Sequence, residues 1–313
     1  MPSNITQSSQ GMTVPQNYRR TFSNNWEQVA IQVNKRFGDT ADMVTVEGKE
    51  KVFHDMDETT FKARTERLAK TVLNELTFSR RKMTKKSYSD HYVFDKDDKE
   101  YLDMLADPRG ELINKFRSSW NRLWDEEFIA ALDATVYGGS NEALNTAINF
   151  DSTNNAIAVN YVASGAAANS GLTMEKVQRA RRVFEEQEYV SNGVPLFMAL
   201  SPKQADDLFQ QAKANLTASY ADIVVEWYND QQNKMLFGFK TIINNRLPID
   251  SSDYQKVFCW AKTAVKVAAD KVTNEMDTRP DLEHALQVSA YGKLAVMRRW
   301  ENGVVRIACD RSP

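Results

Sequence analysis

The sequence predicts an α+β protein in which one long helix and several shorter helices pack beside extended strands. Three observations indicate this class. A helical apolar stripe follows Asp107-Pro108, an alternating apolar–polar stretch covers 42–56, and short apolar runs alternate with helical segments in the second half. With 313 residues, of which 42% are hydrophobic, the chain can bury a substantial core without disulfides.

The long helix is the strongest element. Asp107 offers a side-chain cap, and Pro108 stands at the first helical position, where its missing N–H costs nothing. Gly138-Gly139 favours termination beyond the other end. A helix over 107–134 is therefore predicted, about 40 Å long at 1.5 Å per residue. Its apolar face comprises Leu112, Phe116, Trp120, Leu123, Trp124, Phe128 and Leu132.

The residues before this helix predict an arm and a projection. Residues 1–20 are polar and are expected to form an arm, and 25–37 has the apolar spacing of a short amphipathic helix. Residues 41–62 alternate on both sides of Gly48, which indicates a β-ribbon, and 91–95 indicates a strand. Because 60–90 has no dense apolar stripe, this region is expected to project from the body.

The second half predicts a sheet with helices against it. Helical spacing covers 172–190, the run "LFMAL" at 196–200 indicates a buried strand, and "SPKQ" at 201–204 is a capping box. The C-terminus is expected to form two strands joined by a tight hairpin at Asn302-Gly303. Further strands are predicted at 222–228, 239–244 and 256–269.

Composition and motifs argue against an enzyme. The three histidines stand alone, and no nucleophile elbow, phosphate loop or dinucleotide fingerprint occurs, so no catalytic residue, cofactor or metal site is predicted. Cys259 and Cys309 are expected in the core. The N-terminus lacks the order of a signal peptide, and no apolar window could span a membrane, so a soluble protein made in a cytoplasm is expected.

Two charge blocks stand out in a chain whose net charge is −2. Residues 60–90 hold nine Lys/Arg against three Asp/Glu, and 95–111 hold seven Asp/Glu against three Lys/Arg. We hypothesise that the basic block of one copy contacts the acidic block of a neighbouring copy. Two alternatives stay open: both blocks are solvated surface, or they fold onto each other within one chain. The residues of the proposed contact are Arg80, Arg81, Lys82, Lys85, Lys86, Asp95, Asp97, Asp98 and Asp103.

The order of these segments resembles the major capsid protein of tailed bacteriophages, the Hong Kong 97-like capsid fold, in the branch of short-tailed phages. "VEGKEKVFHDM" resembles the outgoing strand of the extended loop (E-loop), and "FDKDDKEYLDMLADPRGELINKFRSSWNRLWDEEFIAAL" the acidic lead-in and spine helix. "GLTMEKVQRARRVFEEQEYVSNGVPLFMALSPKQADDLF" resembles the axial-domain core, and "YGKLAVMRRWENGVVRIACD" the closing strands. The resemblance covers about residues 25–310.

The resemblance implies an organisation and a function. It implies an arm at 1–40, an extended loop at 41–96, a peripheral domain at 97–190 with the spine helix at 107–134, and an axial domain at 191–290. C-terminal strands at 291–313 would return to the peripheral domain. The implied function is structural: homo-hexamers and homo-pentamers close into an icosahedral shell around double-stranded DNA. Implied partners are a separate scaffolding protein and a portal protein. Assembly would occur in the host bacterial cytoplasm, with the virion capsid as the final location.

Three rival functions remain open on the sequence, and the third is an enzyme with an unrecognised site, which would show a pocket with converging titratable groups. A nanocompartment shell of the encapsulin kind shares the fold and would enclose proteins instead of DNA. A nucleic-acid-binding module using residues 80–86 would bind duplex DNA as a monomer with a steep salt dependence. Against the second, the basic segment is not interleaved with stacking aromatic residues, and the chain is slightly acidic overall.

Overall fold

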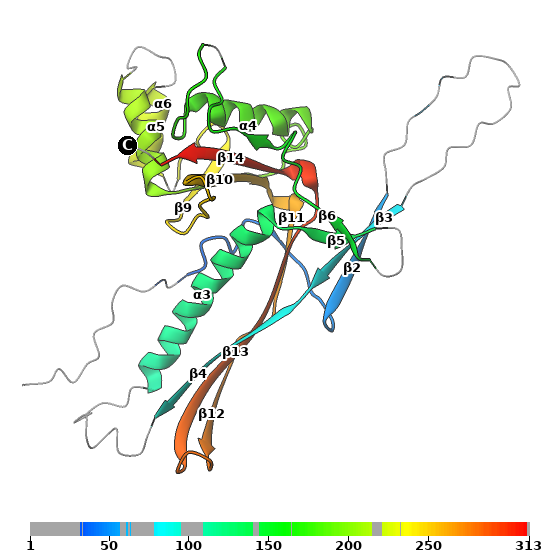
Figure 1. Cartoon of the computed structure of the whole chain (residues 1–313), viewed down its shortest axis with the longest axis vertical. Helices are drawn as coiled ribbons and strands as arrows, with labels where there is room; N and C mark the ends of the chain where they lie inside the picture. The colour runs from blue at the N-terminus through cyan, green and yellow to red at the C-terminus, as the bar shows by residue number, and fades with distance from the viewer. Residues whose placement is uncertain are drawn as a thin grey trace, which may run out of the picture.

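The strands form three sheets around one long helix (Figure 1), which confirms the predicted α+β class. All structural statements concern the residues that the computed structural model describes. These are residues 32, 34–56, 61, 63, 78–94, 109–139, 144–163, 165–214, 221–231 and 233–311.

The long helix is α3, Arg109–Asp133. Its described bounds agree with the predicted helix over 107–134, whose first two residues lie outside the described part. Trp124, Phe128 and Leu132 are buried in the main core. The predicted helix at 25–37 is not helical over 34–37. Phe37 instead stacks on Phe128 with ring centroids 5.2 Å apart, so the N-terminal segment enters the core at α3.

A long, narrow sheet runs beside α3 (Figure 1). Its central strand β13 pairs with β11 near the body, and with β12 and β4 on its two sides farther out. Trp120 of α3 packs on Gly292 of β13, where a Cβ would lie 2.4 Å from the ring. The helix therefore holds the sheet by close contact. The strands are β1 (Asp42–Met43), β4 (Lys86–Phe94), β11 (Val265–Ala269), β12 (Thr273–Arg279) and β13 (Ala285–Arg298).

A second sheet and three helices form the compact part of the molecule, shown at the top of Figure 1. The sheet order is β7-β14-β10-β8-β9. Strand β8 is buried along its whole length, as predicted for "LFMAL", and the capping box at Ser201 and Gln204 forms at the start of α5. The elements are β7 (Ala156–Ile157), α4 (Met174–Glu186), β8 (Leu196–Leu200), α5 (Pro202–Ala214), α6 (Ala221–Asn229), β9 (Phe239–Ile243), β10 (Tyr254–Ala261) and β14 (Val304–Asp310).

The third sheet contains a β-ribbon whose first strand lies in the predicted stretch 41–62 and whose second strand lies outside it. Strands β2 (Glu50–Met56) and β3 (Phe78–Thr84) pair antiparallel from Glu50↔Thr84 to Met56↔Phe78. We call these two strands the E-ribbon. β5 (Val136–Gly138) pairs with β3, and β6 (Thr146–Ile148) pairs with β5. Within the predicted ribbon at 41–62, strands form at Asp42–Met43 and Glu50–Met56, but they do not pair with each other, because β1 pairs with β11 and residues 44–49 form no strand.

The strand predicted at 222–228 is wrong, because this segment is helix α6. Ala221, Val224 and Trp227 are its buried residues, at a helical spacing of three. Tyr228 stacks on Phe209 of α5 with centroids 4.5 Å apart. The β-branched run favoured a strand locally, but packing against α5 buries the face that only a helix presents.

The predicted hairpin at Asn302-Gly303 is also wrong. Strands β13 and β14 belong to different sheets and are joined by a 3-10 turn, η2 (Glu301–Gly303). A Cβ at Gly303 would lie 2.2 Å from the Cβ of Ala264 in the 3-10 turn η1 (Lys262–Ala264), so the glycine allows close packing. Because β14 pairs with β10, the chain returns to the compact sheet. The predicted domain bounds, including the return of 291–313 to the peripheral domain, stay predictions.

Candidate inter-subunit surfaces

The five basic residues singled out in the sequence lie on β3 and at the start of β4. Four of them form ion pairs with acidic residues far away in the sequence of the same chain, and Arg80 forms none with the described residues. The pairs are Arg81 with Glu301 (2.9 Å) and Asp55 (3.9 Å), Lys82 with Glu50 (3.8 Å), Lys85 with Asp270 (2.7 Å) and Lys86 with Glu127 (2.8 Å).

The two faces of the E-ribbon have different environments. Paired residues of an antiparallel ladder point to the same side, so the even-numbered residues of β2 and β3 share one face. Alternation within the two strands buries Asp55 and Met83 on the inner face, which also carries Arg81. Arg80 and Lys82 are on the outer face and are half-buried. The basic segment is therefore divided, and these two residues are the ones turned away from the body.

The outer face is also apolar. Met56 and Phe78 form the last pair of the ladder, and their exposed fractions are 59% and 56%. Val52 and Tyr137 are exposed as well, and each lies opposite Lys82 on a neighbouring strand. Apolar side chains interspersed with positive charge on a projecting sheet are typical of a contact surface rather than of solvated surface.

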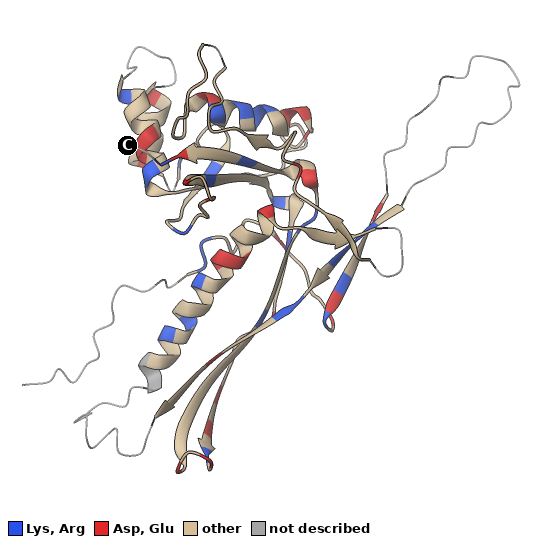
Figure 2. Cartoon of the chain, in the orientation of Figure 1, with Lys and Arg blue, Asp and Glu red and all other residues tan. Residues whose placement is uncertain are grey.

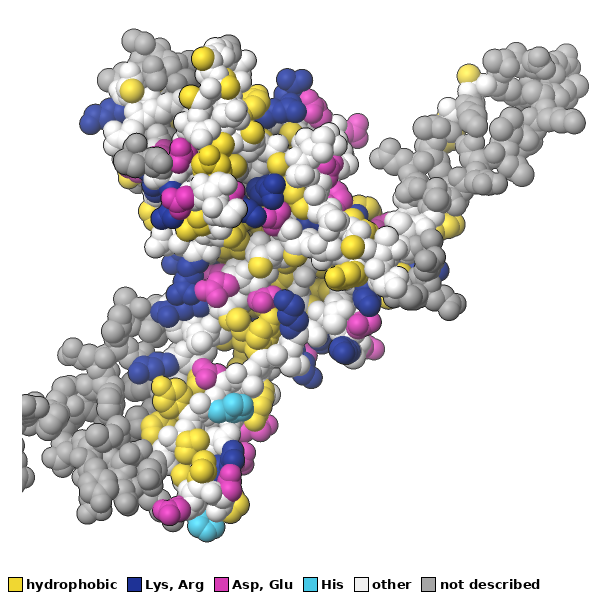
Figure 3. Space-filling view, viewed as in Figure 1, with side chains coloured by type: hydrophobic (Ala, Val, Ile, Leu, Met, Phe, Trp, Pro, Cys, Tyr) yellow, Lys and Arg dark blue, Asp and Glu magenta, His cyan; other side chains and the backbone are white. Residues whose placement is uncertain are grey.

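The acidic residues of the hypothesis, Asp95, Asp97, Asp98 and Asp103, lie outside the described residues. They follow β4, whose last residue, Phe94, pairs with Leu286 of β13. We call residues 90–94 and 275–286 the far end of the long sheet. It carries more acidic than basic side chains (Figure 2), and exposed hydrophobic residues accompany them (Figure 3). The acidic residues are Asp90, Glu275, Asp277, Asp281 and Glu283, and the hydrophobic ones are Tyr92, Val93, Met276 and Leu282.

A buried carboxylate fastens the N-terminal segment to α3. Asp125 accepts hydrogen bonds from Gln32 Nε2 (2.5 Å), from the backbone N–H of Arg36 (3.1 Å) and from that of Phe37 (3.4 Å). Burial raises the pKa of Asp125 above its usual value, and these hydrogen bonds oppose the rise. Gln32, Arg36 and Phe37 are therefore fixed on the helix.

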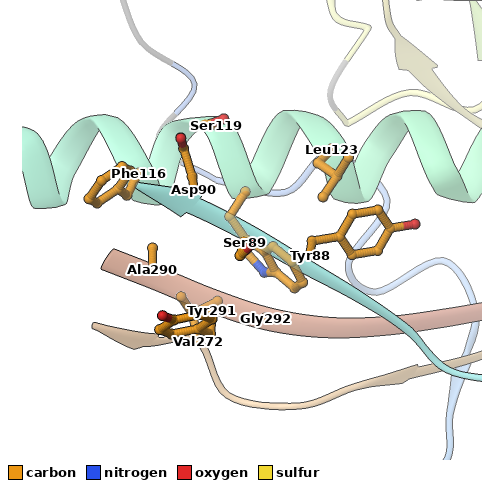
Figure 4. Close-up of a pocket in the computed structure, with 11 residues that line it drawn as sticks. Tyr88, Ser89, Asp90, Phe116, Ser119, Leu123, Val272, Ala290, Tyr291 and Gly292 are labelled. Carbon is orange, nitrogen blue, oxygen red and sulfur yellow. The ribbon is translucent and has the colours of Figure 1, made fainter. Parts of the chain in front are cut away.

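An open cavity of about 220 Å³ lies between α3 and the long sheet (Figure 4). The rings of Tyr88, Phe116, Trp120 and Tyr291 line it, and Asp90 is the one charged residue in its described lining. An acid and a base do not converge there, so the cavity offers no arrangement for proton transfer.

The described residues contain no group of three His, Cys, Asp or Glu residues placed to hold a metal ion. Cys259 and Cys309 are buried as predicted, and burial raises the pKa of Cys309 to about 12. No described helix is long and apolar enough to cross a membrane.

At the base of the E-ribbon lies a charged junction that the local sequence patterns do not indicate. Here Asp55, Arg298, Arg299 and Glu301 meet the predicted residue Arg81. In the sequence, residues 298–303 favour a hairpin, and nothing in this segment indicates that its two arginines are buried. Only the approach of β2, β3 and η2 in the fold brings these charges together.

Comparison with known proteins agrees with the fold. The chain is similar to the capsid of Ralstonia phage GP4, with a TM-score of 0.68, 14% identity, and coverage of 95% of this chain and 97% of that chain. It is also similar to the head structure of Helicobacter pylori bacteriophage KHP40, with a TM-score of 0.68, 10% identity, and coverage of 100% of this chain and 99% of that chain. A third similar structure is the cyanophage Pam1 capsid, with a TM-score of 0.67, 12% identity, and coverage of 94% of this chain and 97% of that chain. No curated protein matches the chain significantly.

At 10–14% identity, these solved structures establish the capsid fold alone. The family to which the chain belongs is shown by a match of its sequence to a family model. The model of a family described as phage capsid protein matches residues 14–311, nearly the whole chain. This agrees with the long helix, the projecting ribbon and the compact sheet described above, and with the absence of a reactive constellation among the described residues. The chain belongs to the phage capsid protein family, whose members are structural proteins.

Proposed function

We propose that this chain is the major capsid protein of a tailed phage, and that its copies assemble as hexamers and pentamers into an icosahedral shell around double-stranded DNA. The family match over 14–311 carries the proposal. The partners would be further copies of the chain, a separate scaffolding protein, a portal protein and DNA bound without sequence specificity. The shell would assemble in the host bacterial cytoplasm and become the virion capsid.

The surfaces of the chain support assembly with identical copies. The E-ribbon presents an apolar and basic outer face, and the far end of the long sheet presents apolar and acidic residues. Both project from the compact part (Figure 1). Charge complementarity between two such surfaces fixes orientation and excludes wrong pairings. We therefore retain the proposed contact between the basic block and the acidic block of a neighbouring copy, with Arg80 and Lys82 as its outward-facing basic residues.

The ion pairs within the chain weigh against a nucleic-acid-binding module at 80–86. Arg81, Lys85 and Lys86 each lie within 2.9 Å of a carboxylate oxygen of their own chain. A phosphate would have to replace these partners. A monomeric duplex-binding surface normally presents its basic side chains freely to the solvent.

Electron microscopy of the expressed protein tests the proposal. Negative-stain images of the chain alone, and of the chain co-expressed with its neighbouring open reading frames, should show closed shells in at least the second sample. Shells that contain a protein cargo and lack any DNA-packaging partner would favour the encapsulin-like alternative. A protein that remains monomeric in both samples, at every concentration and salt tried, would contradict assembly altogether.

A further inference from the structure

The E-ribbon is attached to the body by the pairing of β3 with β5, by a small apolar cluster and by a charged junction. The cluster comprises six buried residues, with Phe53 of β2 packed against it: Val46, Met83, Val136, Ala268, Ala295 and Met297. Apolar contacts hold a ribbon in place, but they are not directional, and a small cluster permits rotation. The pairing of β3 with β5 is directional, but it covers the pairs Arg81↔Gly138 and Lys82↔Tyr137 at one edge of the ribbon. Side-chain contacts at the base of the ribbon are therefore needed to hold both of its strands at one angle.

The junction supplies directional contacts. Glu301 uses its two carboxylate oxygens on two different guanidinium groups: Oε1 lies 2.9 Å from Nη1 of Arg81, and Oε2 lies 2.8 Å from Nε of Arg298. Arg81 belongs to β3, whereas Arg298 is the last residue of β13. One side chain thus bridges the ribbon to the end of the long sheet.

The same junction reaches the end of α3. Nη1 of Arg298 donates hydrogen bonds to the carbonyl oxygens of Leu132 (2.8 Å) and Ala134 (2.9 Å). The last carbonyl groups of a helix have no partner within the helix, so such a donor completes the helix end. A displacement of this last turn would move Arg298, and with it Glu301 and its partner on β3.

A second arginine holds the other strand of the ribbon. Arg299 donates to the carbonyl oxygen of His54 on β2 (2.8 Å) and forms an ion pair with Asp55. Arg298 and Arg299 are 0% and 7% exposed. Burial lowers the pKa of Arg299, and the charge of Asp55 opposes the shift. Arg298, Arg299 and Asp55 are buried, and Arg81 and Glu301 are partly buried beside them, so a misplaced charge at this junction is costly.

We propose that Glu301 is the positioning residue that fixes the direction of the E-ribbon relative to α3. It does so by holding Arg81 of the ribbon against Arg298, which closes the helix. The inference deepens the proposed function, because a ribbon that contacts the next copy must leave the body at a reproducible angle. A Gln at 301 could accept from one guanidinium only, and its amide N–H₂ would face the other.

Distance measurement between two spin labels within one chain tests this. The exposed residues Met56, at the tip of the ladder, and Asn114, on α3, are replaced by cysteine and labelled. The native Cys259 and Cys309 are buried, and burial raises the pKa of both thiols, which disfavours their labelling. Labelled chain is diluted into an excess of unlabelled chain, so that the measured distances are intramolecular. The wild-type background should give one narrow distribution. Glu301→Gln should shift its mean or at least double its width.

Glu226→Gln is the matched control, because Glu226 forms an exposed ion pair with Lys234 far from the ribbon. It should leave the distribution unchanged. Arg81→Gln removes the other partner of the Arg81–Glu301 ion pair. The double variant Arg81→Gln/Glu301→Gln should change the distance distribution no more than either single variant does. A Glu301→Gln distribution that coincides with the wild type would overturn the proposal, even if the variant unfolds at a lower temperature.

Hydrogen exchange of the unmodified protein gives a test that needs no variant. The amides of 80–83 should exchange as slowly as those of 130–133, because the bridge makes the two segments open together. A ribbon that exchanges at least a hundredfold faster than the helix end would overturn the proposal. Particle formation is scored separately by electron microscopy. Loss of the proposed shell without a change in the intramolecular distance would therefore count against assembly and not against the junction.

Discussion

Arg298 closes the C-terminal end of α3: its Nη1 lies 2.8 Å from the carbonyl oxygen of Leu132, a residue 166 positions earlier in the chain. The guanidinium is completely buried and also binds Glu301. A helix end, a long strand and the turn that follows it therefore depend on one side chain. Its removal leaves one carboxylate oxygen of Glu301 and two backbone carbonyl groups without this donor.

Arg298→Met should lower the free energy of unfolding by about 3–5 kcal/mol, the usual cost of breaking a buried pair by removing one partner. Arg298→Lys keeps the charge but cannot make the forked contacts of a guanidinium, so this variant should lower the free energy of unfolding by a smaller amount. Urea denaturation measures both. Arg182→Met, at an exposed ion pair with Glu186 on α4, is the control and should change it by less than about 0.5 kcal/mol. A loss below about 1 kcal/mol for Arg298→Met would mean that the junction does not hold these elements.

Reversal of charge at Arg80 and Lys82 should impair assembly. Like charges placed across an interface cost several kcal/mol, so Arg80→Glu/Lys82→Glu should slow or reduce particle formation by about tenfold or more, as followed by light scattering. In the wild type, about 1 M salt should weaken assembly by screening the attraction. Lys213→Glu, on the exposed end of α5, serves as the control. Assembly of the double variant at the wild-type level in both low and high salt would disprove the contact.

The contribution of Asp125 to stability should depend on pH. Because its folded pKa is raised above 3.8, the folded chain binds this proton more tightly than the unfolded chain does. The stability gained from protonation is therefore present at low pH and is lost as the pH rises through the folded pKa. Relative to Asp125→Asn, which does not titrate, the wild type should become more stable as the pH falls from about 7 toward 4. Urea denaturation at several pH values measures the difference in free energy of unfolding between the wild type and Asp125→Asn. A difference that stays constant, or that changes in the opposite direction, would contradict the raised pKa.

Gly303→Ala should destabilise the fold through overlap. The added Cβ would lie 2.2 Å from the Cβ of Ala264 and 2.9 Å from the hydroxyl of Tyr189. Overpacking of this kind costs about 1–3 kcal/mol. Gly38→Ala is the matched control, because its Cβ would meet its nearest atom at 3.7 Å. Thermal unfolding should separate the two variants, and equal melting temperatures would show that η1 and η2 can move apart without cost.

Local patterns predicted the elements whose packing requires only their own periodicity. The stripe of α3 from Leu112 to Leu132, the buried strand 196–200 and the capping box at Ser201 needed no knowledge of the rest of the chain. In each case the spacing of apolar residues or the chemistry of a helix start is completed within a few residues. The same argument failed at 222–228, where the spacing fitted a helix but residue type favoured a strand.

The partners of buried charges followed no such pattern. Lys176 lies on a charged helix and would be placed at the surface from its sequence, yet it is fully buried and donates to the carbonyl oxygens of Val159, Ser170 and Gly171 at 2.8 Å. Arg81 was expected to face a neighbouring copy, and it binds Glu301 of its own chain.

By itself, the sequence determined the fold class, the long helix, the strand over 50–56 and the family resemblance, because these rest on local periodicity and on the order of segments. The tertiary structure decided which face of the ribbon is exposed, which sheet receives β14, and which carboxylate each arginine binds. Charge acts through space between residues up to 220 positions apart, so its pairing is settled only when the strands and the helix end meet.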